Sequence, residues 1–141
     1  MAAGFDALTD YQGGYGGSVA LQDQGPTYAG ATVGLLQTYN TKFWGGMNFI
    51  PPMPIGMYQW PRASAKSYYH YCNPLPGDIK ARIKQIFDFV RSNPKKCDAQ
   101  VVFSYSWNEH SEGGAICPTM GKTPDYIPVT TCLDEVAEAL K

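Results

Sequence analysis

The strongest constraint on the fold is the alternation of short apolar runs with amphipathic helices along the chain. The clearest helix is DIKARIKQIFDFVRS, residues 78–92, where apolar residues recur every three or four positions and lysines and arginines lie between them. This period predicts a helix with one buried face and its basic residues in solvent, and the following Asn93 and Pro94 predict its end. The run QVVFSYSW, residues 100–107, comes soon afterwards and is typical of a strand.

Two more apolar runs and two more helical patterns complete the series. GFDALTDY, residues 4–11, predicts a strand, and the spacing of apolar residues over 26–44 predicts a helix. MNFIPPMPIGM, residues 47–57, begins as a strand, but its prolines lack an N–H, so we expect only its first residues to pair. TTCLDEVAEALK, residues 130–141, predicts a closing amphipathic helix. The order strand, helix, repeated three times, predicts a parallel sheet with helical crossovers.

Composition and charge narrow the class of protein. A chain of 141 residues with 44% apolar and 16% charged residues is typical of one globular domain. The formal charge of -1 gives no electrostatic reason to expect nucleic acid or an anionic membrane as partner. No apolar run reaches the ~18 residues of a membrane span, and the first ten residues lack the pattern of a signal peptide. With two histidines and no C-x-x-C pair, we expect neither a metal nor another cofactor.

The loops differ in length and composition according to what precedes them. Those that follow the predicted strands are long and rich in tyrosine, tryptophan, glycine and acids, whereas those that follow helices are short. This asymmetry is expected when the carboxyl ends of the strands carry a site. SYSWNEHSEGG, residues 104–114, holds two carboxylates, a histidine, an asparagine and a tryptophan. It is either an ordinary solvated loop or one that brings acids into a pocket.

Three segments, in order, resemble parts of a known enzyme group. VVFSYSWNEHSEGGAICPT, residues 101–119, is similar to the last barrel strand and exit loop of glycoside hydrolases of family 71 and the family 99-like group, with Trp-Asn-Glu followed by Glu-Gly and a distal proline. FIPPMPIGMYQWPR, residues 49–62, resembles the preceding strand, and AGFDALTDY, residues 3–11, resembles the one before it. The resemblance implies a parallel βαβαβα segment like roughly the last three units of a (β/α)8 TIM barrel. Since a whole barrel typically needs ~250 residues, we expect 1–141 to be a single α/β domain or a domain fragment.

The resemblance also implies a function and a set of site residues. The expected function is that of a glycoside hydrolase-like protein acting on a poly- or oligosaccharide, with Glu109 and Glu112 as candidate catalytic carboxyls. Their spacing does not distinguish a retaining from an inverting mechanism, and both could instead be solvated acids. We expect Trp107 to be part of the core or of a pocket wall. The implied substrate-binding residues are Asp10, Tyr11, Tyr58, Arg62, Trp107, Asn108 and His110, with Tyr58 at a position where these families often carry an aspartate.

The alternative function is a non-catalytic carbohydrate-binding or structural module. In either case the expected partner is a carbohydrate, and the families suggest an extracellular location. Three strands cannot cover the inner face of a barrel, so we expect either a homo-oligomer or a missing N-terminal portion of the barrel. Within the strand at 100–107, we expect the bulkier alternate residues to face the helices and the smaller ones to face the barrel interior. The former set is Val101, Phe103, Tyr105 and Trp107, and the latter is Val102, Ser104 and Ser106.

The four cysteines allow a disulfide in the barrel arrangement. The helix at 78–92 separates Cys72 from Cys97 by ~22 Å, well beyond the ~7 Å limit between bridged Cα atoms. Cys72 and Cys117 both lie in loops that follow adjacent strands, so they are the better candidate pair. Such a bridge would imply an oxidising compartment.

Overall fold

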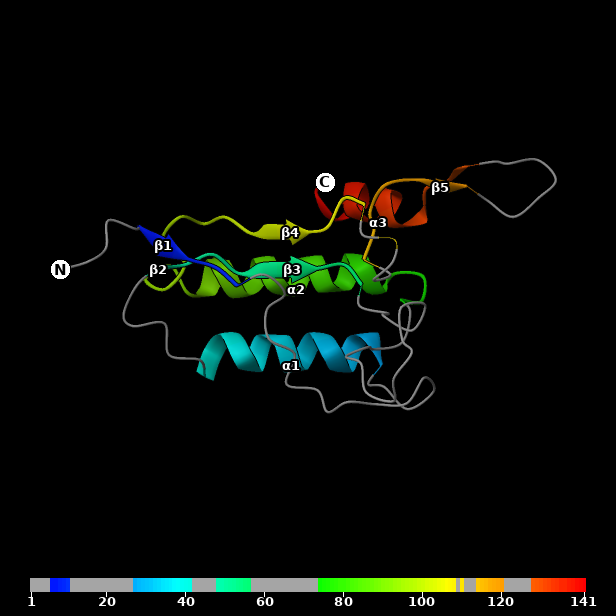
Figure 1. The fold of residues 1–141 in the computed structure, drawn as a ribbon. Helices are drawn as coiled ribbons and strands as arrows, with labels where there is room; N and C mark the ends of the chain where they lie inside the picture. Colours follow the sequence, from blue (N-terminus) through cyan, green and yellow to red (C-terminus); the bar gives the residue numbers. More distant parts are fainter. Residues whose placement is uncertain are drawn as a thin grey trace, which may run out of the picture.

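A computed structural model of the chain describes residues 6–10, 27–41, 48–56, 74–108, 110, 114–120 and 128–141. In chain order their elements are β1 (Ala7–Leu8), α1 (Tyr28–Thr41), β2 (Asn48–Phe49), β3 (Pro52–Pro54), α2 (Asp78–Ser92), β4 (Phe103–Tyr105), β5 (Thr119–Met120), β6 (Pro128–Val129) and α3 (Thr131–Ala139). These described residues form a mixed α/β structure (Figure 1) and do not close into a barrel. Within them, none of the helices is long and apolar enough to cross a membrane.

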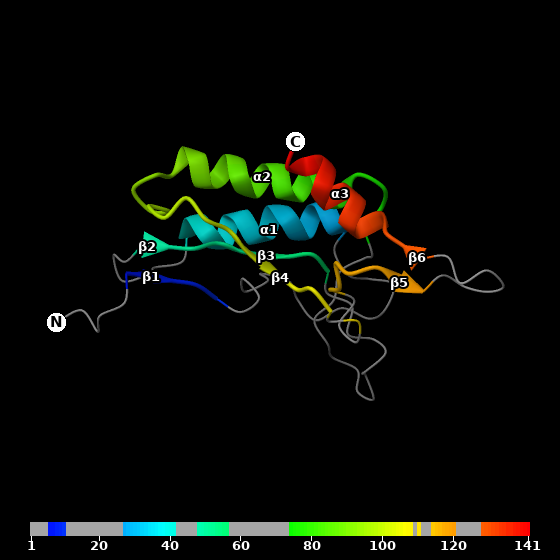
Figure 2. The ribbon, with the colours of Figure 1, turned by 90° about the horizontal axis from the view of Figure 1, so that it is seen from above.

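The strands β1 to β4 pair in parallel, as the sequence predicted, but in two separate two-stranded sheets and not in one. β1 pairs with β2, and β3 pairs with β4, both in parallel. The strands β2 and β3 belong to one extended stretch, residues 48–54. Its first part lies beside β1 and its second part beside β4. All three helices lie on the same side of these strands (Figure 2). The antiparallel pair of β5 with β6 is an addition that the sequence patterns did not predict.

The prediction that prolines would keep the residues after Phe49 out of the ladder is wrong, because Pro52–Pro54 pairs with β4. Successive residues of a strand direct their N–H and C=O groups to opposite neighbours. The carbonyl of Pro51 points toward β4 and accepts a hydrogen bond from Phe103 N at 3.0 Å. The N–H of Ile55 also points toward β4 and donates to Tyr105 O. The two prolines of β3, Pro52 and Pro54, alternate with these residues, so neither of them removes a donor from the ladder with β4.

The opposite edge of β3 needs donors for its carbonyls, and the helices supply them. The hydroxyl of Tyr39 on α1 donates to Pro52 O, and Nη1 of Arg82 on α2 donates to Pro54 O at 2.7 Å. The hydroxyl of Tyr28 donates to the carbonyl of Ile55 at 2.6 Å. This edge offers hydrogen-bond donors from side chains. Proline has a carbonyl that can accept from them and no N–H that would be left without a partner.

The helix bounds follow local signals. α1 begins after Thr27, whose Oγ1 accepts a hydrogen bond from the N–H of Gly30 at 3.0 Å. α2 covers the predicted residues 78–92. The sequence pattern predicts all its arginines on the solvent face, but Arg82 is only 1% exposed. Buried oxygen atoms on α1 and β3 accept hydrogen bonds from its guanidinium. The periodicity of α2 does not reveal these acceptors.

The core lies between α1, α2 and the strands. Tyr39 is at its centre, with its ring centroid 5.3 Å from that of Phe49 and 5.6 Å from that of Phe89. α3 packs against α2 and adds Leu133 and Val136 to the edge of this core. The other buried apolar members of the cluster are Tyr28, Ala31, Leu35, Met53, Ile55, Ile79, Ile83, Ile86, Val90, Cys97 and Ile116.

The expected orientation of β4 holds for only one of the four bulkier residues. Tyr105 is 7% exposed, whereas Val101, Phe103 and Trp107 are 51%, 51% and 61% exposed. Val102, expected on the other face, packs against the core, and Ser104 is exposed. Burial along this strand therefore does not follow a simple alternation.

Candidate functional site

The segment that follows β4, residues 106–117 and here called the exit loop, is closed at its base by backbone hydrogen bonds. The N–H of Ser106 donates to Gly114 O at 3.2 Å, and the N–H of Cys117 donates to Trp107 O at 2.9 Å. These bonds join the first residues of the loop, directly after β4, to its last residues. The base of the exit loop is therefore part of the folded structure.

The last residues of the exit loop, from Gly114 onward, also pack on the end of β3. A Cβ atom at Gly114 would lie 3.1 Å from the carbonyl oxygen of Gly56, which follows β3. Glycine at this position permits the close approach of the two backbones. Ile116, two residues later, is buried in the core. The carboxyl ends of β3 and β4 consequently meet beneath the exit loop.

Three of the predicted site residues come together in the described part of this loop. Trp107 is 61% exposed, so it is not part of the core, and its expected place in a pocket wall stays a prediction. Asn108 and His110 are also exposed, and the N–H of His110 donates to Asn108 O at 2.8 Å in a tight turn. The carboxyl end of β4 thus presents an indole, an amide and an imidazole to solvent within four positions.

Five other predicted residues lie outside the described residues, and their roles stay predictions. They are the two candidate carboxyls and three substrate-binding candidates: Glu109, Glu112, Tyr11, Tyr58 and Arg62.

Asp10 lies apart from the exit loop. The hydroxyl of Thr9 donates to Ile50 O at 2.8 Å, which continues the register of β1 and β2 and puts Asp10 level with Pro51. By the register of β3 and β4, Trp107 is five residues further along the sheet, about 16 Å at the usual rise of a strand. A substrate that contacts both residues would have to span that distance.

A thiol and an imidazole meet in the exit loop, and sequence reasoning missed this pair. The Sγ atom of Cys117 lies 3.4 Å from Nε2 of His110, within hydrogen-bonding distance for sulfur. Cys117 is a free cysteine, and Cys72, its expected partner in a bridge, lies outside the described residues. The two residues are seven positions apart, and only the closure of a glycine-containing loop brings them together. In the part of the chain that is described, no three His, Cys, Asp or Glu side chains are grouped to hold a metal ion.

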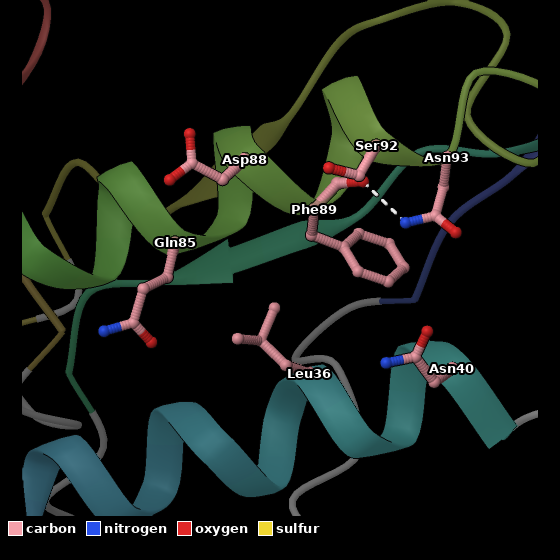
Figure 3. Close-up of a pocket in the computed structure, with 7 residues that line it drawn as sticks. All are labelled: Leu36, Asn40, Gln85, Asp88, Phe89, Ser92 and Asn93. Atoms are coloured by element: carbon pink, nitrogen blue, oxygen red, sulfur yellow. Dashed lines mark hydrogen bonds between the residues drawn. The ribbon is translucent and has the colours of Figure 1, made fainter.

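A shallow cavity of about 340 Å³ lies between α1 and α2 (Figure 3). Leu36 and Phe89 point into it from the two helices, and Asn93 donates to the carbonyl of Phe89 at 2.8 Å. Its remaining lining residues are Asn40, Gln85, Asp88 and Ser92. The cavity is near the last turns of both helices, which lead to the amino ends of the strands. It is therefore at the end of the fold opposite to the exit loop.

Comparisons of the chain with protein families, with curated proteins and with solved structures gave no match in any of the three.

Proposed function

We propose that the chain is a carbohydrate-binding part of a glycoside hydrolase-like protein, with the exit loop on its sugar-binding rim. The observation that carries this proposal is the 61% exposure of Trp107 at the carboxyl end of β4. An indole face can stack on the C–H face of a sugar ring, and the neighbouring Asn108 and His110 can hydrogen-bond its hydroxyls. This combination suits a neutral, hydroxyl-rich ligand, as does the formal charge of -1.

The arrangement of the elements supports a more specific architecture, in which the chain supplies βα units of a (β/α)8 barrel. In such a barrel consecutive strands are parallel neighbours, the helices cover one face, and ligands bind at the carboxyl ends of the strands. The order of β1 to β4 and the one-sided position of the helices (Figure 2) agree with this geometry. The face that holds Phe103, 51% exposed, would then line the barrel interior, covered by further strands or by a second copy. A monomer with a sharp thermal transition in sedimentation and melting experiments would contradict the barrel proposal.

Hydrolysis in this proposal falls to Glu109 and Glu112, which follow Asn108 in the sequence. Two carboxyls on opposite sides of a glycosidic bond provide the acid and the base or nucleophile that this reaction needs. The assignment depends on the sequence resemblance, whereas the sugar-binding assignment also depends on the exposure of Trp107. The two can therefore be tested separately.

Binding is tested by calorimetric titration with α-glucan, β-glucan and mannan oligosaccharides. We expect one of these classes to bind, and Trp107→Ala to weaken binding by about two- to twelvefold, since an aromatic contact contributes about 0.5–1.5 kcal/mol. Leu140→Ala is the matched control, because Leu140 is 64% exposed but follows α3. Equal affinities of wild type and Trp107→Ala would refute the proposed site.

Catalysis is tested by release of reducing ends from whichever oligosaccharide binds. If Glu109 acts as acid, base or nucleophile, Glu109→Gln should lower turnover at least ~100-fold while the affinity for the sugar is retained. Glu112→Gln should have a smaller effect unless Glu112 is the second carboxyl. Binding by the wild type without turnover would favour the non-catalytic module.

A further inference from the structure

The exit loop holds a nucleophile that the proposed carbohydrate site does not use. Cys117 is half-buried and free, and its Sγ atom lies 3.4 Å from Nε2 of the exposed His110. The backbone bond from the N–H of Cys117 to Trp107 O fixes one partner, and the bond from the N–H of His110 to Asn108 O fixes the other. The closeness of the two side chains thus follows from the closure of the loop.

A thiol beside an imidazole is the arrangement that activates cysteine in many proteins. The thiolate is the reactive form, and an unassisted thiol is only a few per cent ionised at pH 7. An imidazole within hydrogen-bonding distance can accept the thiol proton and stabilise the thiolate as an ion pair. Both partners reach solvent here, so a small reagent can approach the sulfur.

We propose that Cys117 and His110 form a thiol-modification site that reacts with small electrophiles. In the step, the Cys117 sulfur attacks the electrophilic carbon and an S–C bond forms while the bond from carbon to the leaving group breaks. The electron pair of that bond departs with the leaving group, iodide in the case of iodoacetamide. The thiol proton passes to Nε2 of His110 and from there to solvent. This inference does not depend on carbohydrate binding.

The other described cysteines provide references within the same molecule. Cys97 is 0% exposed, and burial raises the pKa of its thiol. Cys132 is half-buried like Cys117, but burial and the nearby Glu135 raise the pKa of its thiol. The raised pKa of Cys132 already slows that thiol, so the effect of the imidazole is read from the change in the rate of Cys117 when His110 is replaced.

The test is the rate of carbamidomethylation by iodoacetamide at pH 7, measured for each cysteine by mass spectrometry of the digested protein. We expect Cys117 to react about tenfold faster than Cys132 in the folded wild type. His110→Gln, which keeps a hydrogen-bonding side chain but cannot take up a proton at this pH, should slow Cys117 several-fold and leave the rate of Cys132 unchanged. In guanidinium chloride the ratio of the two wild-type rates should approach one, because unfolding separates the pair and exposes both thiols.

Each readout can overturn the inference. A ratio near one in the folded wild type would mean that the imidazole does not activate the thiol. An unchanged rate of Cys117 in His110→Gln would give the reactivity another cause, and a high ratio that persists in denaturant would assign it to the local sequence.

Discussion

Arg82 is the residue whose replacement we expect to destabilise the protein most, because its guanidinium joins three elements from a buried position. Its Nε, Nη1 and Nη2 donate hydrogen bonds of 2.7, 2.7 and 3.0 Å to Thr32 Oγ1, Pro54 O and Tyr28 O. Its Cζ atom also lies 3.6 Å from the centroid of the Tyr28 ring. One side chain on α2 thus holds both α1 and β3.

The expected magnitude for Arg82→Met follows from these contacts. Methionine preserves much of the apolar packing but supplies no donor, and the carbonyls of Pro54 and Tyr28 are backbone groups that stay buried. Each lost hydrogen bond to a charged donor contributes about 1.5–3 kcal/mol, partly offset because the charge is no longer buried. We expect a loss of about 3 kcal/mol in the free energy of unfolding, or roughly 10 °C in Tm.

Urea unfolding followed by circular dichroism measures this change. Arg91→Met is the matched control on the same helix. The side chain of Arg91 is 71% exposed, and its Nη1 lies 3.7 Å from Oδ1 of Asp88. The expected change in the free energy of unfolding is less than ~0.5 kcal/mol. Arg82→Lys keeps the charge but loses the planar fork of donors, so its stability should fall close to that of Arg82→Met. A loss of less than ~1 kcal/mol in Arg82→Met, within the range of ordinary substitutions, would refute the reasoning.

Two further predictions concern stability. Glu135→Gln should lower the free energy of unfolding by about 1–2 kcal/mol, because the carboxylate of α3 caps α2. It accepts hydrogen bonds of 2.8, 3.0 and 3.1 Å from the N–H groups of Gly77, Ile79 and Lys80. Glu138→Gln removes only an exposed ion pair of α3, so thermal melting should show less than ~0.5 kcal/mol of change; equal losses in the two variants would contradict the capping role. Burial raises the pKa of the Cys97 thiol above 9.0, so above that pH the unfolded chain binds fewer protons and stability should decrease as pH rises. Cys97→Ala should flatten this decrease in urea titrations at successive pH values, and an unchanged slope would count against it.

The sequence was sufficient for those parts of the fold that depend on neighbouring residues. α2 has the predicted bounds because its apolar period and the following Asn93 and Pro94 are local signals. The parallel pairing of the strands also follows from their alternation with helices. The pairing of Pro52–Pro54 could not be predicted in this way. It depends on donors from Tyr39 and Arg82, which are distant in the sequence.

The position of the exit loop was predictable, but the exposure and contacts of its side chains were not. The change from apolar to polar residues after β4 located the exit loop correctly at the end of a strand. Trp107 alternates in phase with Tyr105, yet Tyr105 is 7% and Trp107 61% exposed, so a period of two could not predict the exposure of Trp107. The approach of His110 to Cys117 depends on the closure of the loop. The contact of Gly114 with Gly56 contributes to that closure, and the sequence alone does not reveal this contact.

The two polar links of α2 connect this helix to β3 and to α3. Arg82 fixes α2 to β3, the neighbour of β4, and β4 leads into the loop. Glu135 fixes α3 to the beginning of α2, and α3 comes after the loop in the chain (Figure 1). Because both attachments are to the same helix, a shift of α2 would move β3 and α3 together. The helix most clearly encoded in the sequence is therefore linked, through β3 and β4, to the start of the loop whose residues are proposed to bind sugar and to carry the reactive thiol.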